Sequence, residues 1–266
     1  MYAFDYVRPA SLADALKAIG TGDDVRPLAG GQTLIPTIKQ RLAMPSSLVD
    51  LGGIAELKGV RRDGNGITIG AMTTHFEVSQ SKDVWDAIPA LGHLAAHIGD
   101  PAVRSQGTIG GSVANNDPAA DYPAAVLALG ATVITTQREI HADQYFGGLF
   151  ATALKPGELI KAIRFPVPMK AGYAKFEQRA SRYALVGVFV AQTAAGVRVA
   201  VTGSGASGVF RAPSLEAALG KAFSVDGLKG ASVPATGLMS DLHGSAEYRA
   251  SIIPVIAERA VAHALK

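Results

Sequence analysis

Residues 28–36, Leu28-Ala29-Gly30-Gly31-Gln32-Thr33-Leu34-Ile35-Pro36, place two adjacent glycines between a short apolar run and a segment that can begin a helix. Because glycine has no Cβ, its backbone N–H can come close to a ligand. A helix that begins just after the glycines adds unpaired N–H donors and the positive end of its dipole. The stretch therefore indicates a seat for an anion such as a phosphate, although a glycine pair alone is more often a plain turn.

A second glycine-rich stretch favours the anion site over the plain turn. Residues 107–124 read GTIGGSVANNDPAADYPA, so almost every side chain in them is small or is short and polar. Short polar groups on a glycine-rich backbone suit hydrogen bonds to a large polar ligand. We expect these residues to form a loop that lies against such a ligand.

Composition excludes several classes of function. The 266 residues are 48% hydrophobic and 18% charged, with a formal charge of +3 and no run of lysine or arginine, so no nucleic-acid partner is indicated. The absence of cysteine excludes disulfides, thiolate-bound iron–sulfur clusters and cysteine nucleophiles. No signal peptide is visible, and the longest apolar stretches are about half the length of a membrane span. We therefore expect a cytoplasmic protein that does not span a membrane.

Hydrophobic periodicity and turn residues divide the chain into three units. In residues 1–52 we expect an α/β unit, with a helix that begins after Ser11 and a strand–glycine turn–helix around Gly30-Gly31. Residues 53–167 are expected to be a second α/β unit, with a capping box between Thr74 and Glu77. The elements expected in this unit are strands at 66–71, 131–136 and 159–165 and helices at 85–97 and 124–129.

The third unit, residues 168–266, has the pattern of an α+β domain. Three segments alternate in the manner of antiparallel strands, and two helices follow them. The strands are expected at 173–177, 185–191 and 197–202, and the helices at about 214–221 and 247–265.

The two glycine motifs, AGGQTLIP and GTIGGSVANNDPAADYPAA, together resemble the FAD-binding medium subunit of molybdenum hydroxylases. The carbon monoxide dehydrogenase type is the most similar pattern, and the wider family includes the flavin domain of xanthine dehydrogenase. The resemblance covers the whole chain, including the MYAFDYVRPASLADAL start, IGAMTTH, IGDPAVRSQGTIGG and YAKFEQRASRYALVG. It implies an α+β protein with a PCMH-type FAD-binding fold, in which two α/β subdomains hold FAD between them and a C-terminal α+β domain follows.

The same resemblance assigns roles to individual residues. Two groups would clamp the pyrophosphate of FAD, mainly through backbone N–H. Asp121 matches an acidic position near the cofactor, Leu159 an apolar contact with the ring system, and Lys175 a lysine near the flavin. Tyr183 matches an aromatic residue over the isoalloxazine. The clamp residues are Ala29, Gly30, Gly31, Gln32 and Thr33 on one side and Thr108, Gly110, Gly111 and Ser112 on the other.

Other motifs are weaker. Residues 203–208 fit G-x-G-x-x-G. A dinucleotide site requires a helix that begins inside this motif, but the residues that follow it, up to Pro213, delay the expected helix until about Ser214. His93 and His97 have a spacing that can bind zinc on a helix, yet no third ligand is evident, so packing histidines are the better interpretation. No P-loop motif and no G-x-S-x-G motif is present.

The leading interpretation is therefore an electron-transfer subunit of a molybdenum hydroxylase. The resemblance implies a small [2Fe–2S] subunit and a large molybdopterin subunit as partners, in a heterohexamer that is a dimer of heterotrimers. Electrons would pass through FAD to an acceptor such as a quinone or NAD, and the substrate would react in the large subunit, with no catalytic or metal-binding residue in this chain. Two alternatives stay open: a self-contained flavin oxidoreductase of the same fold, and a non-catalytic nucleotide-binding scaffold.

Overall fold

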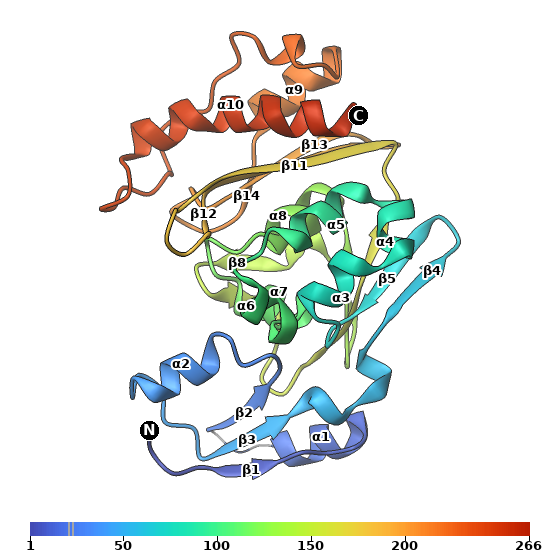
Figure 1. The fold of residues 1–266 in the computed structure, drawn as a ribbon, viewed down its shortest axis with the longest axis vertical. Coiled ribbons are helices and arrows are strands. Elements are labelled where there is room, and N and C mark those ends of the chain that lie inside the picture. Colours follow the sequence, from blue (N-terminus) through green and yellow to red (C-terminus); the bar gives the residue numbers. More distant parts are fainter. Residues whose placement is uncertain (21, 23) are drawn as a thin grey trace.

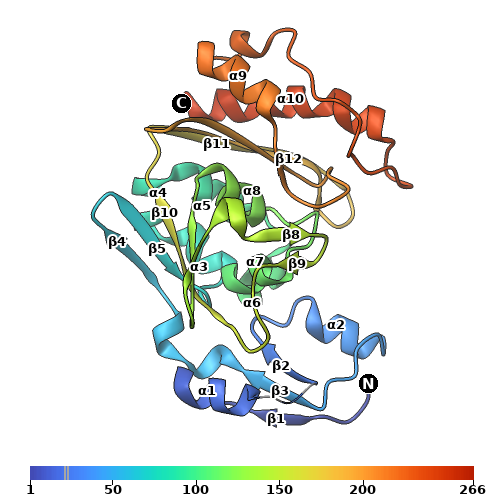
Figure 2. The same cartoon turned by 180° about the vertical axis from the view of Figure 1, so that it is seen from behind.

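The computed structural model describes residues 1–20, 22 and 24–266. Three of the four sheets in the described residues are stacked with their helices along the long axis of the molecule, and the fourth is a small two-stranded sheet. The N-terminal sheet lies at one end and the C-terminal sheet and its helices at the other (Figure 1; Figure 2). The molecule is a mixed α+β protein, as the sequence predicts.

The first layer is a small parallel sheet of order β1-β3-β2. Helix α1 begins as predicted, because the Ser11 side chain accepts a hydrogen bond from the backbone N–H of Asp14, and it ends at Gly20 with a φ of +46°. The bounds are β1 Asp5–Val7, α1 Leu12–Ile19, β2 Val25–Leu28, α2 Leu34–Lys39, β3 Ser47–Asp50 and two short 3-10 turns, Leu51–Gly53 and Ala55–Leu57.

The second layer is an antiparallel sheet of order β4-β5-β10-β6-β7 with several helices packed on it. The capping box between Thr74 and Glu77 is confirmed at the start of α3. The prediction of a single helix over residues 85–97 is wrong. The helix ends at Ile88, because Pro89 has no N–H to donate, and Pro89 instead begins the next helix. The bounds are β4 Val60–Asp63, β5 Gly66–Gly70, α3 His75–Gln80, α4 Lys82–Ala87, α5 Pro89–Ala96 and α6 Pro101–Gln106.

The loop expected over the second glycine stretch is also wrong in part, because residues 109–115 form helix α7. Thr108 is its N-cap and accepts a hydrogen bond from Gly111 N–H, and Asn116 ends it in the left-handed conformation with a φ of +45°. The remaining bounds of this layer are α7 Ile109–Asn115, α8 Tyr122–Ala128, β6 Thr132–Thr135, β7 Glu139–His141, a 3-10 turn Ala142–Gln144, β8 Phe146–Gly148, β9 Ala151–Thr152 and β10 Ile160–Pro166.

The third layer is the antiparallel sheet β11-β12-β13-β14, as the alternating segments predict. Helix α10 covers one face so closely that a Cβ on Gly172 would lie 1.9 Å from the carbonyl oxygen of Ala260. Helices α5 and α8 lie against the other face (Figure 1), so strand β12 is buried on both sides. The bounds are β11 Lys170–Glu177, β12 Ala184–Thr193, β13 Gly196–Thr202, β14 Phe210–Arg211, α9 Pro213–Lys221, a 3-10 turn Asp226–Leu228 and α10 Ala246–Ala264.

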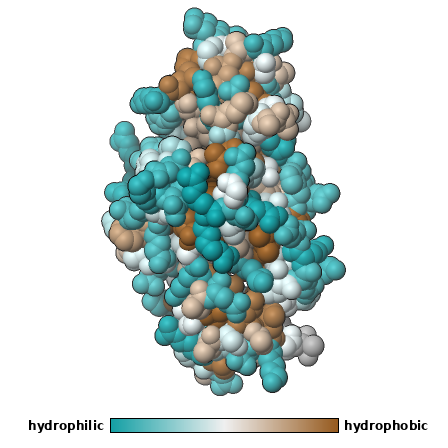
Figure 3. Space-filling model, turned by 90° about the vertical axis from the view of Figure 1, so that its right-hand side faces the viewer, coloured by the Kyte–Doolittle hydropathy of each residue, from teal (hydrophilic) through white to brown (hydrophobic). Residues whose placement is uncertain are grey.

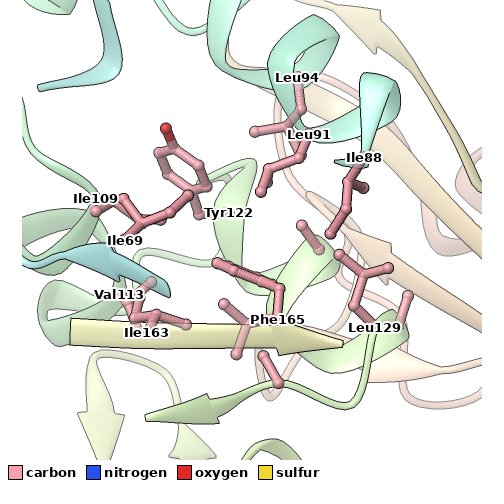
Figure 4. Packing of buried hydrophobic residues seen from close by; sticks show 14 of the residues in the cluster. Ile69, Ile88, Leu91, Leu94, Ile109, Val113, Tyr122, Leu129, Ile163 and Phe165 are labelled. Carbon is pink, nitrogen blue, oxygen red and sulfur yellow. The ribbon is translucent and has the colours of Figure 1, made fainter. Parts of the chain in front are cut away.

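The largest apolar core joins the second sheet to its helices. Ile69 and Phe165 from the sheet point toward Leu91 of α5 and Tyr122 of α8 (Figure 4). This core fixes the position of α7 and α8, which carry the second glycine stretch. The side of the surface drawn in Figure 3 is mixed, with small apolar groups separated by polar residues. In the part of the chain that the structure describes, no helix is both long and apolar enough to cross a membrane.

Candidate functional site

A cleft of about 590 Å³ lies between the first and second layers and extends to the turn before β12. Its volume is in the range of small-molecule and cofactor sites. Both glycine stretches line it, as do Leu159 and the residues 181–183. Segments from all three layers therefore contribute to one site.

The first glycine stretch presents free backbone donors to this cleft. Among the described residues, the N–H groups of Gly30, Gly31, Gln32 and Thr33 have no hydrogen-bond acceptor. Gly31 has a φ of +71°, which a residue with a Cβ adopts only with strain. The sequence thus correctly identifies this turn as a set of unpaired donors at the start of α2.

The second glycine stretch provides fewer free backbone donors than were expected of it, because only Thr108 of its four selected residues has an N–H without an acceptor among the described residues. The N–H of Gly110 donates to Ala71 O at 2.8 Å, that of Gly111 to Thr108 Oγ1 at 3.1 Å, and that of Ser112 to Thr108 O at 3.0 Å. These N–H groups are already used to begin α7 and to dock it on β5. At the cleft wall this stretch retains the N–H of Thr108, the hydroxyl groups of Thr108 and Ser112 and the side-chain amide of Asn115.

The two glycine stretches touch each other. A Cβ on Gly30 would lie 2.1 Å from the carbonyl oxygen of Gln106, and a Cβ on Gly111 would lie 3.4 Å from the Cβ of Ala29. Glycine is therefore required at Gly30, where the first and second layers meet. Twelve of the thirteen residues selected from the sequence line the cleft: Ala29, Gly30, Gly31, Gln32, Thr33, Thr108, Gly110, Gly111, Ser112, Asp121, Leu159 and Tyr183.

Lys175 is the exception: it does not line the cleft itself but contacts two residues that do, Asp121 and Arg182. Its Nζ lies 3.1 Å from Asp121 Oδ1, and both side chains are almost completely buried. The hydroxyl of Tyr173 donates to the same carboxylate oxygen. Burial raises the pKa of the Asp121 carboxyl, against the opposing effect of the Lys175 charge. Asp121 is thus a carboxyl at the cleft wall with two buried donors behind it.

Leu159 is held in the cleft by the turn that precedes it. The buried carboxylate of Glu158 accepts hydrogen bonds from Thr135 Oγ1 at 2.6 Å, Lys155 N at 2.8 Å and Arg138 Nε at 3.1 Å. These three bonds close the turn between β9 and β10. Leu159 therefore presents its side chain from a rigid turn.

Tyr183 lies on a strained turn between β11 and β12. Arg182 has a φ of +60°, and its carbonyl oxygen accepts a hydrogen bond of 2.8 Å from Lys175 Nζ. The side chain of Tyr183 is half exposed. Residues forced into the left-handed region are concentrated at functional sites. This turn places the aromatic ring of Tyr183 at the cleft.

His75 is a cleft residue that the sequence analysis did not select. It is buried, its Nδ1 has no hydrogen-bond partner among the described residues, and its ring packs on Tyr122 at 5.4 Å between centroids. Burial, followed by the charge of Arg104, lowers the pKa of His75 to about 4. The sequence offered one signal for this position: His75 directly follows Thr73-Thr74, and Thr74 caps the start of a helix.

The weaker motifs do not form sites of their own. Residues 203–208 are followed by a short strand, and a helix begins only at Pro213, so no helix opens inside the G-x-G-x-x-G pattern. The ring of His93 packs against those of His97 and His263, but in the described residues no group of histidine and carboxylate side chains is arranged to hold a metal ion.

Comparison with known proteins supports the expected relationship. Residues 2–168 match the family model described as "FAD binding domain in molybdopterin dehydrogenase". The carbon monoxide dehydrogenase medium chain of Afipia carboxidovorans is 38% identical, with 98% of this chain and 96% of that protein covered. The glyceraldehyde dehydrogenase medium chain of Sulfolobus acidocaldarius is 36% identical, with 97% and 96% covered.

Solved structures agree with this result over nearly the whole chain. Reconstituted CO dehydrogenase from Oligotropha carboxidovorans superimposes with a TM-score of 0.89 at 36% identity, covering 99% of this chain and 98% of that one. Quinoline 2-oxidoreductase from Pseudomonas putida 86 gives 0.88 at 31% identity, covering 99% and 97%.

Proposed function

Because the chain belongs to the family of FAD-binding domains in molybdopterin dehydrogenases, we propose that it is the electron-transfer subunit of a molybdenum hydroxylase. Electrons from [2Fe–2S] clusters in a partner subunit reach FAD in this chain and pass on to an external acceptor. The bound flavin supplies the chemistry, since it accepts electrons and delivers them to the acceptor. The chain itself binds FAD, orients it and adjusts its environment.

The four unpaired N–H groups of residues 30–33 are the observation that carries this proposal. A pyrophosphate needs several donors to offset its desolvation, and backbone N–H groups at a turn before a helix provide them without an arginine. The glycines also keep the approach free of Cβ atoms. We assign Ala29, Gly30, Gly31, Gln32 and Thr33 to this side of the pyrophosphate.

On the other side of the pyrophosphate we assign Thr108, Gly110, Gly111 and Ser112. Because the N–H groups of Gly110, Gly111 and Ser112 are engaged at the start of α7, the contacts we propose here are the N–H of Thr108, which has no acceptor among the described residues, and the hydroxyl groups of Thr108 and Ser112. Gly110 contributes by allowing α7 to lie against Ala71, and Gly111 by leaving room beside Ala29. The clamp therefore rests on backbone donors on one side and mainly on hydroxyl groups on the other.

For the flavin ring we assign Asp121, Leu159 and Tyr183, which line the same cleft. Leu159 offers an apolar contact, and Tyr183 offers an aromatic face of the kind that stacks on ring systems. Lys175 acts through Asp121, and the positive charge behind that carboxyl favours negative charge in the cleft.

The relatives support partner subunits for this chain, since they are named medium chains or medium subunits. We propose a small [2Fe–2S] subunit and a large molybdopterin subunit, in a dimer of heterotrimers located in the cytoplasm. The acceptor is a quinone, NAD or another external oxidant. The relatives' names refer to substrates as different as carbon monoxide, glyceraldehyde and nicotine, which agrees with a substrate chosen outside this chain.

Affinity purification of the tagged chain from its own cells tests the proposal. We expect two further chains to co-purify, together with iron, molybdenum and a flavin spectrum that bleaches with dithionite and returns in air. Absence of both the iron–sulfur and the molybdopterin chain contradicts the proposal. Substrate turnover by the isolated FAD-loaded chain favours the self-contained oxidoreductase instead, and a cofactor that does not bleach favours the scaffold.

A further inference from the structure

A second cavity, of about 530 Å³, lies at the edge of the third sheet where the ends of α5 and α10 meet β11. Helix α10 covers one face of the sheet and α5 the other (Figure 1), so both helix ends reach this edge. The cavity is lined by three histidines, His93, His97 and His263, together with Tyr173 and Lys175, and we call it the histidine pocket.

Two side chains of the histidine pocket extend to the FAD cleft. Lys175 and Tyr173 line the pocket, and both contact the carboxylate of Asp121, which lines the cleft. The exposed fractions are 5% for the Lys175 side chain and 4% for that of Asp121. These three polar residues therefore form the partition between the two cavities.

The partition is costly as a purely structural feature. A buried ion pair loses the hydration of both charges, and apolar residues of similar size often replace such a pair without loss of stability. Lys175 Nζ is also held in place by the carbonyl oxygens of His97 and Arg182, each at 2.8 Å. Its third hydrogen is directed to Asp121, so the one proton that can move from Nζ has a carboxylate as its acceptor.

Groups that exchange protons surround the pocket side of this partition. His97 ends α5, His263 lies near the end of α10 with its Nδ1 2.8 Å from Tyr173 O, and His93 packs between them. Burial and the neighbouring histidines lower the pKa of His93 to about 4, so this ring is a neutral acceptor at pH 7. Glu177, Arg259 and Lys266 are the other charged groups that face the pocket.

Resting on the proposed function, we propose that Lys175, assisted by Tyr173, conducts protons between the histidine pocket and Asp121 at the wall of the FAD cleft. Reduction of a flavin takes up protons as well as electrons. Lys175 Nζ gives its third proton to the Asp121 carboxylate, Asp121 releases that proton to the cleft, and water in the histidine pocket returns a proton to Nζ. The electrons come from the iron–sulfur partner, and transfer to the acceptor reverses the proton movement, so charge balances over one cycle.

The substitution Lys175→Arg separates proton conduction from electrostatics. Arginine keeps the positive charge but does not release its proton in proteins. In the purified complex, flavin bleaching by excess dithionite is followed in H₂O and in D₂O, and the flavin midpoint potential is titrated. We expect bleaching at least about tenfold slower, as for loss of a proton-transfer group, with a larger solvent isotope effect and an unchanged midpoint potential.

The matched control is Lys170→Arg, at an exposed position of the same strand β11, and it should leave all three measurements unchanged. If the Lys175→Arg complex bleaches at the wild-type rate and shows the wild-type solvent isotope effect, the proposal is overturned. Because dithionite supplies the electrons, this result does not depend on the iron–sulfur partner. Failure of the proposed function appears separately, as the absence of partner chains in the purification.

If arginine prevents folding or FAD retention, Lys175→Ala provides the second test. The shorter side chain leaves space beside Asp121 that is reached from the histidine pocket. Added methylammonium should restore bleaching in proportion to its concentration, whereas tetramethylammonium, which carries no proton, should not. Equal effects of the two cations, or no effect of either on a slow variant, contradict proton conduction through Nζ.

Discussion

Lys175 Nζ lies 3.1 Å from Asp121 Oδ1 in a site that is closed to solvent on nearly all sides. The pair joins β11 of the third layer to the start of α8 in the second. Since Asp121 also lines the cleft that we propose for FAD, this one contact would link the stability of the fold to the environment of the cofactor.

Removing the lysine should destabilise the protein strongly. Lys175→Met leaves the Asp121 carboxyl buried without its ionic partner, and we expect a loss of about 3–5 kcal/mol in the free energy of unfolding. Urea denaturation followed by circular dichroism measures it. The control is Lys82→Met, which breaks the exposed Lys82–Asp86 pair and should cost no more than about 0.5 kcal/mol. Equal effects of the two substitutions contradict the buried role of Lys175.

Gly31→Val should abolish retention of FAD. Gly31 has a φ of +71°, and a β-branched residue there shifts the turn that lines the cleft and carries the unpaired N–H groups. FAD content per chain after purification measures the effect. Gly237→Val is the control, because Gly237 also has a positive φ, of +83°, but lies outside the cleft and has open space around it. Normal flavin content in a folded Gly31→Val protein contradicts the pyrophosphate assignment.

Tyr183→Ala should increase the fluorescence of the bound flavin severalfold. An aromatic ring stacked on the isoalloxazine quenches its emission, and alanine removes that ring from the half-exposed position at the cleft. Emission is compared at equal flavin content. Tyr248→Ala, at another exposed tyrosine that does not line the cleft, serves as the control. If the emission of Tyr183→Ala is unchanged, the Tyr183 ring does not stack on the isoalloxazine.

His75 should make stability depend on pH in the acid range. Its pKa is about 4 in the folded protein against an ordinary value of 6.5. The unfolded chain therefore binds a proton at a higher pH than the folded one. The stabilising contribution is complete above pH 6.5 and is lost as the pH falls toward 4, by an amount on the order of 3 kcal/mol.

The substitution His75→Gln tests this dependence. Urea unfolding at several pH values should give a flatter profile between pH 6.5 and 4 than the wild type gives. His243→Gln, at an exposed histidine, should reproduce the wild-type slope. A His75→Gln profile parallel to that of the wild type shows that this ring does not titrate differently on folding.

Local signals predicted most of the elements correctly. Ser11 before α1 and the Thr74–Glu77 pair before α3 are confirmed because a helix cap is made by residues three apart in sequence. The antiparallel strands β11 to β13 are confirmed by their alternation. The errors were also local: Pro89 divides the helix over 85–97, and Thr108 begins a helix where small residues suggested a loop. The unit boundaries after residues 52 and 167 stay predictions.

The sequence by itself determined the family and the chemistry of the first glycine turn. Paired glycines before a helix leave N–H groups unpaired wherever that turn is placed, so Gly30-Gly31 is informative without any long-range contact. Only the tertiary structure decided the rest of the site. Docking of α7 beside the end of β5 uses the N–H of Gly110, whose acceptor is Ala71 O, and packing of β11 beside α5 and α8 brings Lys175 and Tyr173 to Asp121. Both depend on contacts between segments far apart in the chain, which local sequence patterns do not encode.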